Sequence, residues 1–294
     1  IKFGVFATLF IPLVVTEFTF YPFIFGKAIF FQVLVSLTFV LWLVEFARGR
    51  IDLKWTKINI VLLVYFVVLG LATVFSLDFL RSFWSTQERM TGFFNLAHFG
   101  VYFLIISTTF RKTDFRWLFR VSLGVGVASG IWALIAGGVR ISGPLGNPGF
   151  LGIYIMLNLF LAIYLILEDK NKYLRIGYSL IFIFNTLVLY MTGTRGAWLG
   201  FFAGVLIFAL GKIKKSKKEK KRLAVLFLIL FIFLSSLFFL IQKDRFFQSG
   251  GGRVASWDIS FNAFKERPIL GWGPENYILA FGKHYNQEFA EKES

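Results

Sequence analysis

Residues 176–210 read IGYSLIFIFNTLVLYMTGTRGAWLGFFAGVLIFAL, and this stretch indicates the architecture of the whole chain. An almost wholly apolar run, Ile176 to Met191, ends at the turn TGTRG, and a second apolar run, Ala197 to Leu210, follows at once. A helix needs roughly 20 apolar residues to cross a bilayer. The stretch therefore predicts two membrane helices joined by a short turn that places Arg195 at a membrane surface.

The composition extends this interpretation to all 294 residues, of which 57% are hydrophobic and only 16% charged. A water-soluble domain of this length cannot bury so much apolar surface in one core. We predict an all-α fold, a polytopic membrane protein with about nine transmembrane helices. The nine apolar runs are roughly 4–20, 23–46, 58–77, 93–110, 117–138, 149–167, 175–192, 197–211 and 223–241. Because Glu17 and Pro22 interrupt the opening stretch, the first two runs also fit one hairpin of unequal arms.

Basic residues orient these helices. Four alternate connections, 48–57, 111–120, 170–175 and 212–222, carry clusters of Lys and Arg, so they face the cytoplasm together with the N-terminus. We predict a transmembrane bundle at 1–242 in the cytoplasmic (inner) membrane and a partly helical extracytoplasmic loop at 243–294, with further transmembrane helices after it. The net charge of +16 follows mostly from this orientation, so no nucleic-acid partner is indicated.

Four arginines stand on the predicted outer side, where basic residues are normally avoided: Arg81, Arg89, Arg140 and Arg195. A guanidinium group is permanently charged, and its donors fit phosphate or carboxylate. Each arginine alone is explained by anchoring in lipid head groups, but together they indicate a shared anionic ligand equally well.

The outer loop GPLGNPG at 143–149 contains Asn147 within a backbone of glycine and proline turns. The N–H groups of such turns can form an anion-binding nest, although a plain re-entrant connection uses the same residues.

The C-terminal stretch RVASWDISFNAFKE, 253–266, places Val254, Trp257, Phe261 and Phe264 at helical spacing on one face. Glycine and proline turns follow around Trp272 in RPILGWGPENY. An amphipathic helix and an aromatic turn on the outer face predict a lid over a pocket that opens toward lipid. Arg253 lies one turn before Trp257, and a cation–π contact between them is the simpler explanation of that spacing.

The strings GPLGNPG, TGTRGAWLG and RPILGWGPENY, in this order and with Arg253 four residues before Trp257, resemble the O-antigen ligase and polymerase superfamily over about residues 75–294. The resemblance implies an inverting membrane glycosyltransferase of lipopolysaccharide and polysaccharide biosynthesis. Its donor would be a glycan on undecaprenyl pyrophosphate, and its acceptor a hydroxyl group of a glycan, lipid or protein outside the membrane. No metal or other cofactor is implied.

The resemblance also implies roles for single residues. Arg195 and Arg253 match the family's arginines that hold the pyrophosphate, and Arg89 in ERMTG matches the arginine of the first outer loop. The remaining substrate-binding candidates are Arg81, Arg140, Asn147, Trp257 and Trp272.

The general base is less clear, because the family's His-Asn motif is absent. His284, in KHYNQEF, is the candidate within the chain, although an ordinary loop histidine is the simpler explanation and the family histidine is expected beyond Ser294. His98 is expected to be a hydrogen-bonded core histidine.

Three alternatives stay open. A repeat-unit polymerase shares the motifs of a ligase. A transporter of lipid-linked oligosaccharide would need polar residues at the bilayer midplane, and interhelical hydrogen bonds explain Asn158 and Asn185 there. A non-catalytic membrane scaffold gives the outer arginines no reason to converge.

Overall fold

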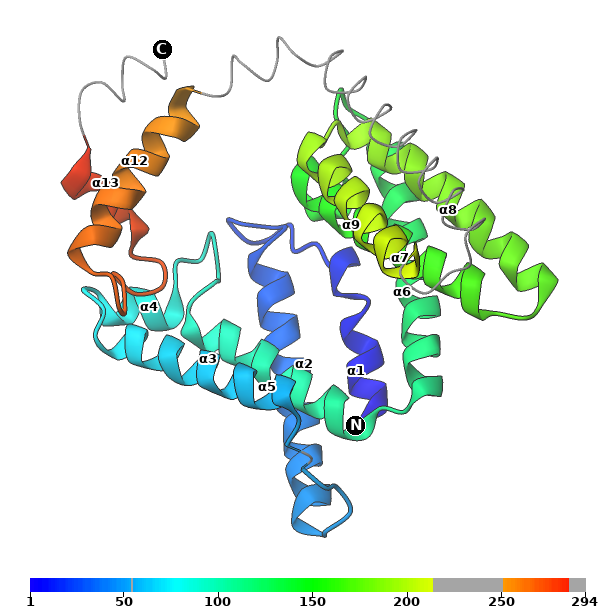
Figure 1. The fold of residues 1–294 in the computed structure, drawn as a ribbon, viewed down its shortest axis with the longest axis horizontal. Coiled ribbons are helices and arrows are strands. Elements are labelled where there is room, and N and C mark those ends of the chain that lie inside the picture. Colours follow the sequence, from blue (N-terminus) through cyan, green and yellow to red (C-terminus); the bar gives the residue numbers. More distant parts are fainter. Residues whose placement is uncertain (54, 214–250, 286–294) are drawn as a thin grey trace. The chain divides into compact units, whose positions relative to one another are not determined.

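The computed structural model describes residues 1–53, 55–213 and 251–285, which form helices joined by turns and loops (Figure 1). The predicted helix 223–241 lies outside the described residues. The helices are α1 (Lys2–Thr8), the 3-10 helix η1 (Ile11–Leu13), α2 (Phe25–Ala47), α3 (Lys57–Val74), α4 (Phe79–Trp84), α5 (Phe93–Thr109), α6 (Lys112–Ala136), the 3-10 helix η2 (Gly143–Leu145), α7 (Pro148–Glu168), α8 (Lys172–Thr192), α9 (Arg195–Ile213), α12 (Gly251–Glu266) and α13 (Tyr277–His284).

The apolar runs predicted between residues 23 and 211 each correspond to one helix, α2, α3, α5, α6, α7, α8 or α9. Among the described helices, α2, α3, α6, α7 and α8 are long and apolar enough to cross a membrane, whereas α5 and α9 are shorter apolar helices. The all-helical fold and the membrane class are therefore confirmed, but only five described helices meet the length for a span.

The run predicted at 4–20 is not one helix, and this prediction is wrong. The chain forms α1, then η1 with Pro12 in its first turn, and then turns through residues 17–24. In the turn segment Thr16 N–H donates to the Pro22 carbonyl at 3.0 Å. Proline lacks a donor and clashes with the preceding helical turn, so Pro12 and Pro22 favour this broken path over a continuous helix.

Local sequence signals set several helix ends. Asn147 caps α7 by accepting from Gly149 N–H at 2.7 Å, with Pro148 at the first helical position. Asn171 caps α8 in the same way, and Gly193 ends α8 in the left-handed conformation at φ +61°. The residues at these positions therefore determine where α7 begins and where α8 begins and ends.

The described residues form two compact units. The first contains Ile1–Val125 and the segment from Gly251 onward. Its core lies between α1, α2 and α5, where Val5, Trp42 and Ile105 are buried. The Trp42 indole N–H donates to the Thr108 hydroxyl at 2.9 Å, a hydrogen bond between helices of the kind that stabilises membrane bundles.

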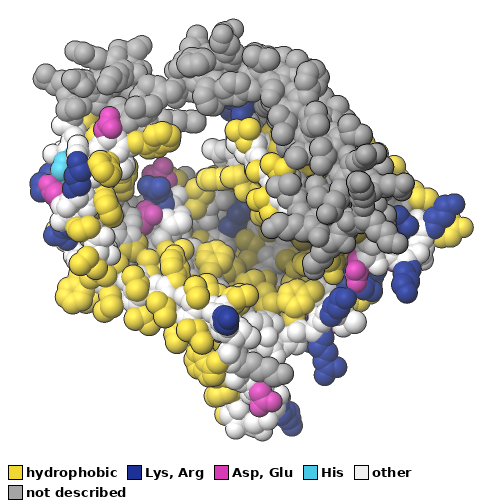
Figure 2. Space-filling model, viewed as in Figure 1, with side chains coloured by type: hydrophobic (Ala, Val, Ile, Leu, Met, Phe, Trp, Pro, Cys, Tyr) yellow, Lys and Arg dark blue, Asp and Glu magenta, His cyan; other side chains and the backbone are white. Residues whose placement is uncertain are grey.

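One face of the first unit is strongly apolar. Figure 2 shows hydrophobic side chains gathered over α3 and α5. Along α3 the exposed side chains include Val61, Val64, Tyr65 and Val68. In a membrane protein such a face contacts the acyl chains of lipids.

The second unit, Gly126–Gly250, has its core between α7 and α8. The buried core side chains include Leu151, Ile155, Leu159, Val188 and Leu189. Glycines bring neighbouring helices close, since a Cβ atom at Gly130 of α6 would lie 2.9 Å from the Phe184 ring of α8. Small residues at helix crossings are typical of membrane bundles.

Asn158 and Asn185 lie in this core, as their positions in apolar runs predicted. Asn158 donates to the Tyr154 carbonyl of its own helix at 3.0 Å. Asn185 is completely buried, and within the described residues neither its side-chain nitrogen nor its oxygen has a hydrogen-bond partner. The interhelical hydrogen bond predicted for Asn185 is therefore absent from the part of the chain that the structure describes.

Candidate active site

The predicted site residues fall in both units. Arg140, Asn147 and Arg195 belong to the second unit, and the remaining candidates belong to the first. In the second unit, the loop between α6 and α7 lies against the turn between α8 and α9. We call the loop 137–147 and the turn 192–196 together the arginine turn.

Backbone and side-chain hydrogen bonds join the two parts of the arginine turn. Arg140 Nε donates to the Thr192 carbonyl at 2.8 Å, and Ile141 N–H donates to the Met191 carbonyl at 3.3 Å. The Thr194 hydroxyl donates to the Pro148 carbonyl at 2.9 Å, which ties the start of α9 to the start of α7.

Close approach makes small residues necessary here. A Cβ atom at Gly193 would lie 3.1 Å from Arg140 Nε, and a Cβ atom at Gly152 would lie 2.8 Å from Thr194 Cβ. Gly193 of the turn and Gly152 of α7 therefore serve this packing, and Gly193 also supplies the positive φ that ends α8.

Arg195 begins α9, and its side chain is partly buried. Its Nη1 atom is buried and has no hydrogen-bond partner within the described residues. A buried guanidinium donor without an acceptor is unfavourable, and the positive end of the helix dipole lies at the same point. An anion bound here would satisfy both.

Asn147 has a different observed role. Its side-chain oxygen caps α7, and its side chain is exposed. Its predicted role in substrate binding has no support from this contact, because the oxygen is already used by the helix.

In the first unit, residues 271–276, which we call the C-terminal turn, contact the loop between α3 and α5. The Ser82 hydroxyl of α4 donates to the Pro274 carbonyl at 2.8 Å, and the buried Asn276 amide donates to the Ser82 hydroxyl at 3.1 Å. Thr91 donates to the Glu275 carboxylate at 2.6 Å. We call this contact, between residues 76–92 and 271–276, the loop clasp.

Backbone strain is concentrated in the loop clasp. Ser85, Met90 and Glu275 have φ values of +69°, +51° and +62°, and they are the non-glycine residues with positive φ in the described part of the chain. Such conformations persist only where the surrounding structure fixes them, and they cluster at functional sites.

The loop clasp uses one of the predicted arginines. Arg89 Nε lies 3.5 Å from the Glu275 carboxylate, while 65% of the Arg89 side chain remains exposed. Arg81 lies in the last turn of α4, and within the described residues its guanidinium has no hydrogen bond or ion pair. Arg89 thus lies at the C-terminal turn, and both guanidinium groups keep donors that the described residues do not occupy.

The helix predicted at 253–266 is α12, which spans Gly251–Glu266. Ile259 and Ala263 are buried, and Ile259 packs against Phe281 of α13. Trp257, Phe261 and Phe264 are more than half exposed. The Arg253 side chain lies outside the described side chains, so the cation–π contact predicted with Trp257 stays a prediction.

Trp272 holds α12 and α13 together. Its indole N–H donates to the Ala263 carbonyl at 2.9 Å, and its ring lies 5.5 Å from the Arg267 guanidinium and 5.6 Å from Lys283 Nζ. These cation–π contacts and the hydrogen bond account for the tryptophan without a ligand.

His284 lies beside Trp272 at the end of α13. Its side chain is 17% exposed, and its Nε2 atom lies 3.3 Å from a Glu266 oxygen, without hydrogen-bond geometry. Lys283 donates to the other Glu266 oxygen at 2.7 Å, and this hydrogen bond holds the pKa of the Glu266 carboxyl below its usual range. His284 is therefore packed, not an exposed loop histidine.

His98 is the hydrogen-bonded core histidine that we predicted. Its Nδ1 atom lies 2.7 Å from the Phe94 carbonyl, and its Nε2 atom lies 3.0 Å from the Ser36 hydroxyl. In the neutral ring, Nδ1 donates to the carbonyl and Nε2 accepts from the hydroxyl. Within the described residues, no group of three or more His, Asp or Glu side chains is placed to hold a metal ion.

Several residues of these contacts were not identified from the sequence. Ser82, Glu275, Asn276 and Thr194 are short polar residues without a recognisable spacing. Their hydrogen-bond partners lie far away along the chain, so no local pattern marks them.

The described helices define a helical membrane protein with polar turns at the helix ends. Residues 180–293 match the family model described as O-antigen ligase, which confirms the resemblance to the O-antigen ligase and polymerase superfamily. The matched segment contains Arg195, Arg253, Trp257, Trp272 and His284. The family is one of glycosyltransferase-like enzymes. The comparison with curated proteins gives no match, and neither does the comparison with solved structures.

Proposed function

We propose that this protein is an O-antigen ligase-like glycosyltransferase of the cytoplasmic membrane. It transfers a glycan from undecaprenyl pyrophosphate to an acceptor hydroxyl on the outer face. The observation that carries the proposal is the buried Nη1 atom of Arg195 at the start of α9, which has no hydrogen-bond partner in the described part of the chain and lies in the arginine turn together with Arg140. The family match over residues 180–293 supports the same class of reaction.

The reaction breaks one bond and forms one. The acceptor oxygen attacks the anomeric carbon of the donor sugar, and the bond from that carbon to the pyrophosphate oxygen breaks. The pyrophosphate leaves with the electron pair, and a general base takes the hydroxyl proton. Attack from the face opposite the leaving group inverts the anomeric carbon.

Arg195 and Arg253 stabilise the leaving group in this proposal, since charge develops on the pyrophosphate as the bond breaks. Arg140, Arg81 and Arg89 add positive charge to the outer face and attract the anionic donor. Guanidinium groups supply the stabilisation that a metal ion gives in other phosphate chemistry, so the proposed reaction needs no metal or cofactor.

His284 is the candidate base within the chain, and its Nε2 atom lies 3.3 Å from a Glu266 oxygen. The His284→Gln variant tests this role. Loss of transfer with α12 and α13 still folded supports it, and unchanged transfer assigns the base to another residue.

The acceptor distinguishes a ligase from a polymerase within the superfamily. A ligase joins the glycan to lipid, glycan or protein of another kind, and a polymerase joins it to a second carrier-linked repeat. We place the ligase first, because TRG at 194–196 followed by RPILGWG at 267–273 resembles that branch of the superfamily.

The test is glycan transfer by the purified full chain in liposomes with an undecaprenyl-pyrophosphate glycan and a panel of acceptors. We expect Arg195→Ala and Arg253→Ala each to lower the rate of transfer by about 100-fold to 1000-fold, as removal of one oxyanion donor does. Arg175→Ala is the matched control, because it removes an exposed arginine from α8, outside the arginine turn. Thermal unfolding of each variant checks that the fold survives.

Normal transfer by both variants would overturn the assignment of these arginines. If the unmutated chain transfers to no acceptor but moves the donor across the liposome membrane, the transporter replaces the glycosyltransferase as the function.

A further inference from the structure

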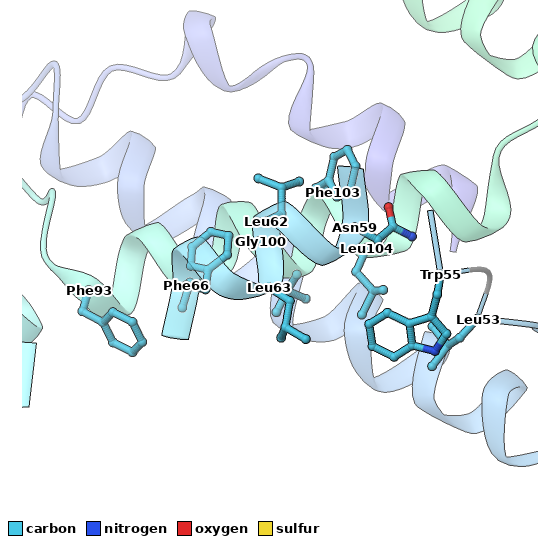
Figure 3. Close-up of a pocket in the computed structure, with 12 residues that line it drawn as sticks. Leu53, Trp55, Asn59, Leu62, Leu63, Phe66, Phe93, Gly100, Phe103 and Leu104 are labelled. Atoms are coloured by element: carbon cyan, nitrogen blue, oxygen red, sulfur yellow. The ribbon is translucent and has the colours of Figure 1, made fainter. Parts of the chain in front are cut away.

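A long apolar groove lies between α3 and α5 in the first unit (Figure 3). Its volume is about 360 Å³. Leu62, Leu63 and Phe66 line it from α3, and Phe93, Gly100 and Leu104 line it from α5. Leu53 and Trp55 stand at one end and Phe93 at the other, so the groove follows the first half of α3 and α5 from Phe93 to Leu104.

A second cavity of about 500 Å³ adjoins the groove at the end marked by Trp55. The two share Asn59 and Phe103 in their linings. The second cavity is polar as well as apolar, and its lining includes Arg50, Asp52, Thr56, Ser107 and Thr108. An apolar groove beside a polar cavity that shares part of its lining is the shape complementary to an amphipathic molecule.

The charges in the polar cavity are of both signs. Arg50 Nη1 lies 3.0 Å from a Glu45 oxygen, and a guanidinium group has five N–H donors, so this ion pair leaves donors for a phosphate. Within the described residues, Asp52 has no hydrogen bond or ion pair. A cation and an anion that line one cavity match a ligand with a phosphate and an ammonium group.

We propose that these two cavities bind one phospholipid with a zwitterionic, primary-ammonium head group. One acyl chain occupies the groove between α3 and α5, the phosphate contacts Arg50, and the ammonium group contacts Asp52. An anionic head group would be repelled by Asp52, and a quaternary ammonium cannot donate a hydrogen bond to it. Trp55 lies between the two cavities. This position corresponds to the membrane–water interface, where tryptophan is enriched.

The experiment is native mass spectrometry of the purified full chain after exchange into nanodiscs of phosphatidylethanolamine, phosphatidylcholine or phosphatidylglycerol. We expect one retained lipid, with about a tenfold preference for phosphatidylethanolamine over each of the others, the effect of one charge-assisted hydrogen bond. Asp52→Asn should remove the preference, and Arg50→Gln should lower retention of every phospholipid.

Two matched controls separate the site from general effects. Arg48 is the other arginine that contacts Glu45, and it does not line the cavity. Arg48→Gln should therefore leave lipid retention unchanged. Leu63→Trp fills the groove and should abolish retention, whereas Leu71→Trp changes an exposed leucine of the same helix outside the groove and should not.

Equal retention of the three lipids, a preference for phosphatidylglycerol, or retention that survives both Leu63→Trp and Arg50→Gln would overturn the proposal. Thermal unfolding in each nanodisc provides a second readout, since a lipid bound to the folded state raises the unfolding temperature.

Discussion

At the residue scale, Gly273 shows how closely the two sides of the loop clasp approach. Its φ is +89°, and an added Cβ atom would overlap Ser76, lie 2.8 Å from the Ser82 hydroxyl oxygen and lie 3.1 Å from the Ala72 carbonyl oxygen. Gly271 also has a positive φ, +67°, but an added Cβ atom there meets nothing within 4 Å. Substitution of Gly271 therefore tests backbone strain alone, and substitution of Gly273 tests backbone strain together with steric overlap.

We expect Gly271→Ala to lower the free energy of unfolding by about 1–2 kcal/mol, because alanine disfavours positive φ. Gly273→Ala should cost a further ~1–3 kcal/mol from overpacking and should open the loop clasp. Hydrogen exchange of α4 and α13, measured together with thermal unfolding, checks both effects. Equal destabilisation by the two variants would show that the close approach contributes nothing.

The site arginines were predicted from their positive charge and their predicted side of the membrane, which are properties of single positions. The hydrogen-bond partners in the site were not predicted. Glu275 bonds to Thr91 across 184 positions of sequence, and Thr194 bonds to Pro148 across 46. Such pairs are fixed by tertiary packing, which a single sequence does not display.

At the element scale, α12 and α13 are joined by Trp272 and by the ion pair of Glu266 with Lys283. The pKa of Glu266 is lowered in the folded state, first by the hydrogen bond from Lys283. A carboxyl with a lowered pKa stabilises the fold above its unfolded pKa, about 4.3, and that contribution disappears as the pH falls through the lower folded value.

We therefore expect the amide protection factors of α12 and α13 to be constant above about pH 5 and to fall below about pH 4. The measurement is hydrogen exchange corrected for the intrinsic rate at each pH. In Glu266→Gln, protection should be weaker at neutral pH and insensitive to acid over the same range. Acid sensitivity that persists in this variant would exclude Glu266 as its cause.

The elements themselves were largely predicted from the sequence, and α7 shows why. Its run, predicted at 149–167 from apolar length, differs by one residue at each end from Pro148–Glu168, and the structure shows that the Asn147 cap sets the start. For α12 the sequence predicted the helix and an apolar face that contains Trp257, Phe261 and Phe264. In the structure these side chains are exposed, and Ile259 and Ala263 are buried. Periodicity reports which residues are apolar, and it does not report which apolar face meets protein and which meets lipid.

At the scale of the whole molecule, the distribution of basic loops predicts which helix ends face the cytoplasm. The chain has no cysteine, so one introduced cysteine is the only thiol that a reagent can reach. Glu88 and Val139 lie in predicted outer loops, Arg111 and Lys170 lie in predicted cytoplasmic loops, and all four are exposed.

We expect Glu88→Cys and Val139→Cys to react with a membrane-impermeant maleimide on intact cells. Arg111→Cys and Lys170→Cys should react only after the membrane is permeabilised, because positive loops stay on the cytoplasmic side. Labelling of all four positions after permeabilisation is the control for accessibility. The reverse pattern would invert the proposed topology and remove the arginine turn from the outer face.

The loop clasp has a consequence for biosynthesis. Residues 76–92 leave the ribosome long before residues 271–276, and the first unit needs both segments. Domains that are continuous in sequence can fold while translation proceeds. Here the Ser82 hydroxyl donates to the Pro274 carbonyl, which is synthesised 192 residues later. Until then Ser82 and the strained backbone at Ser85 and Met90 lack the segment that they contact in the folded protein. α4 and the loops beside it thus reach their final structure only after residues 271–276 have been made, although the core between α1, α2 and α5 uses no residue of that segment.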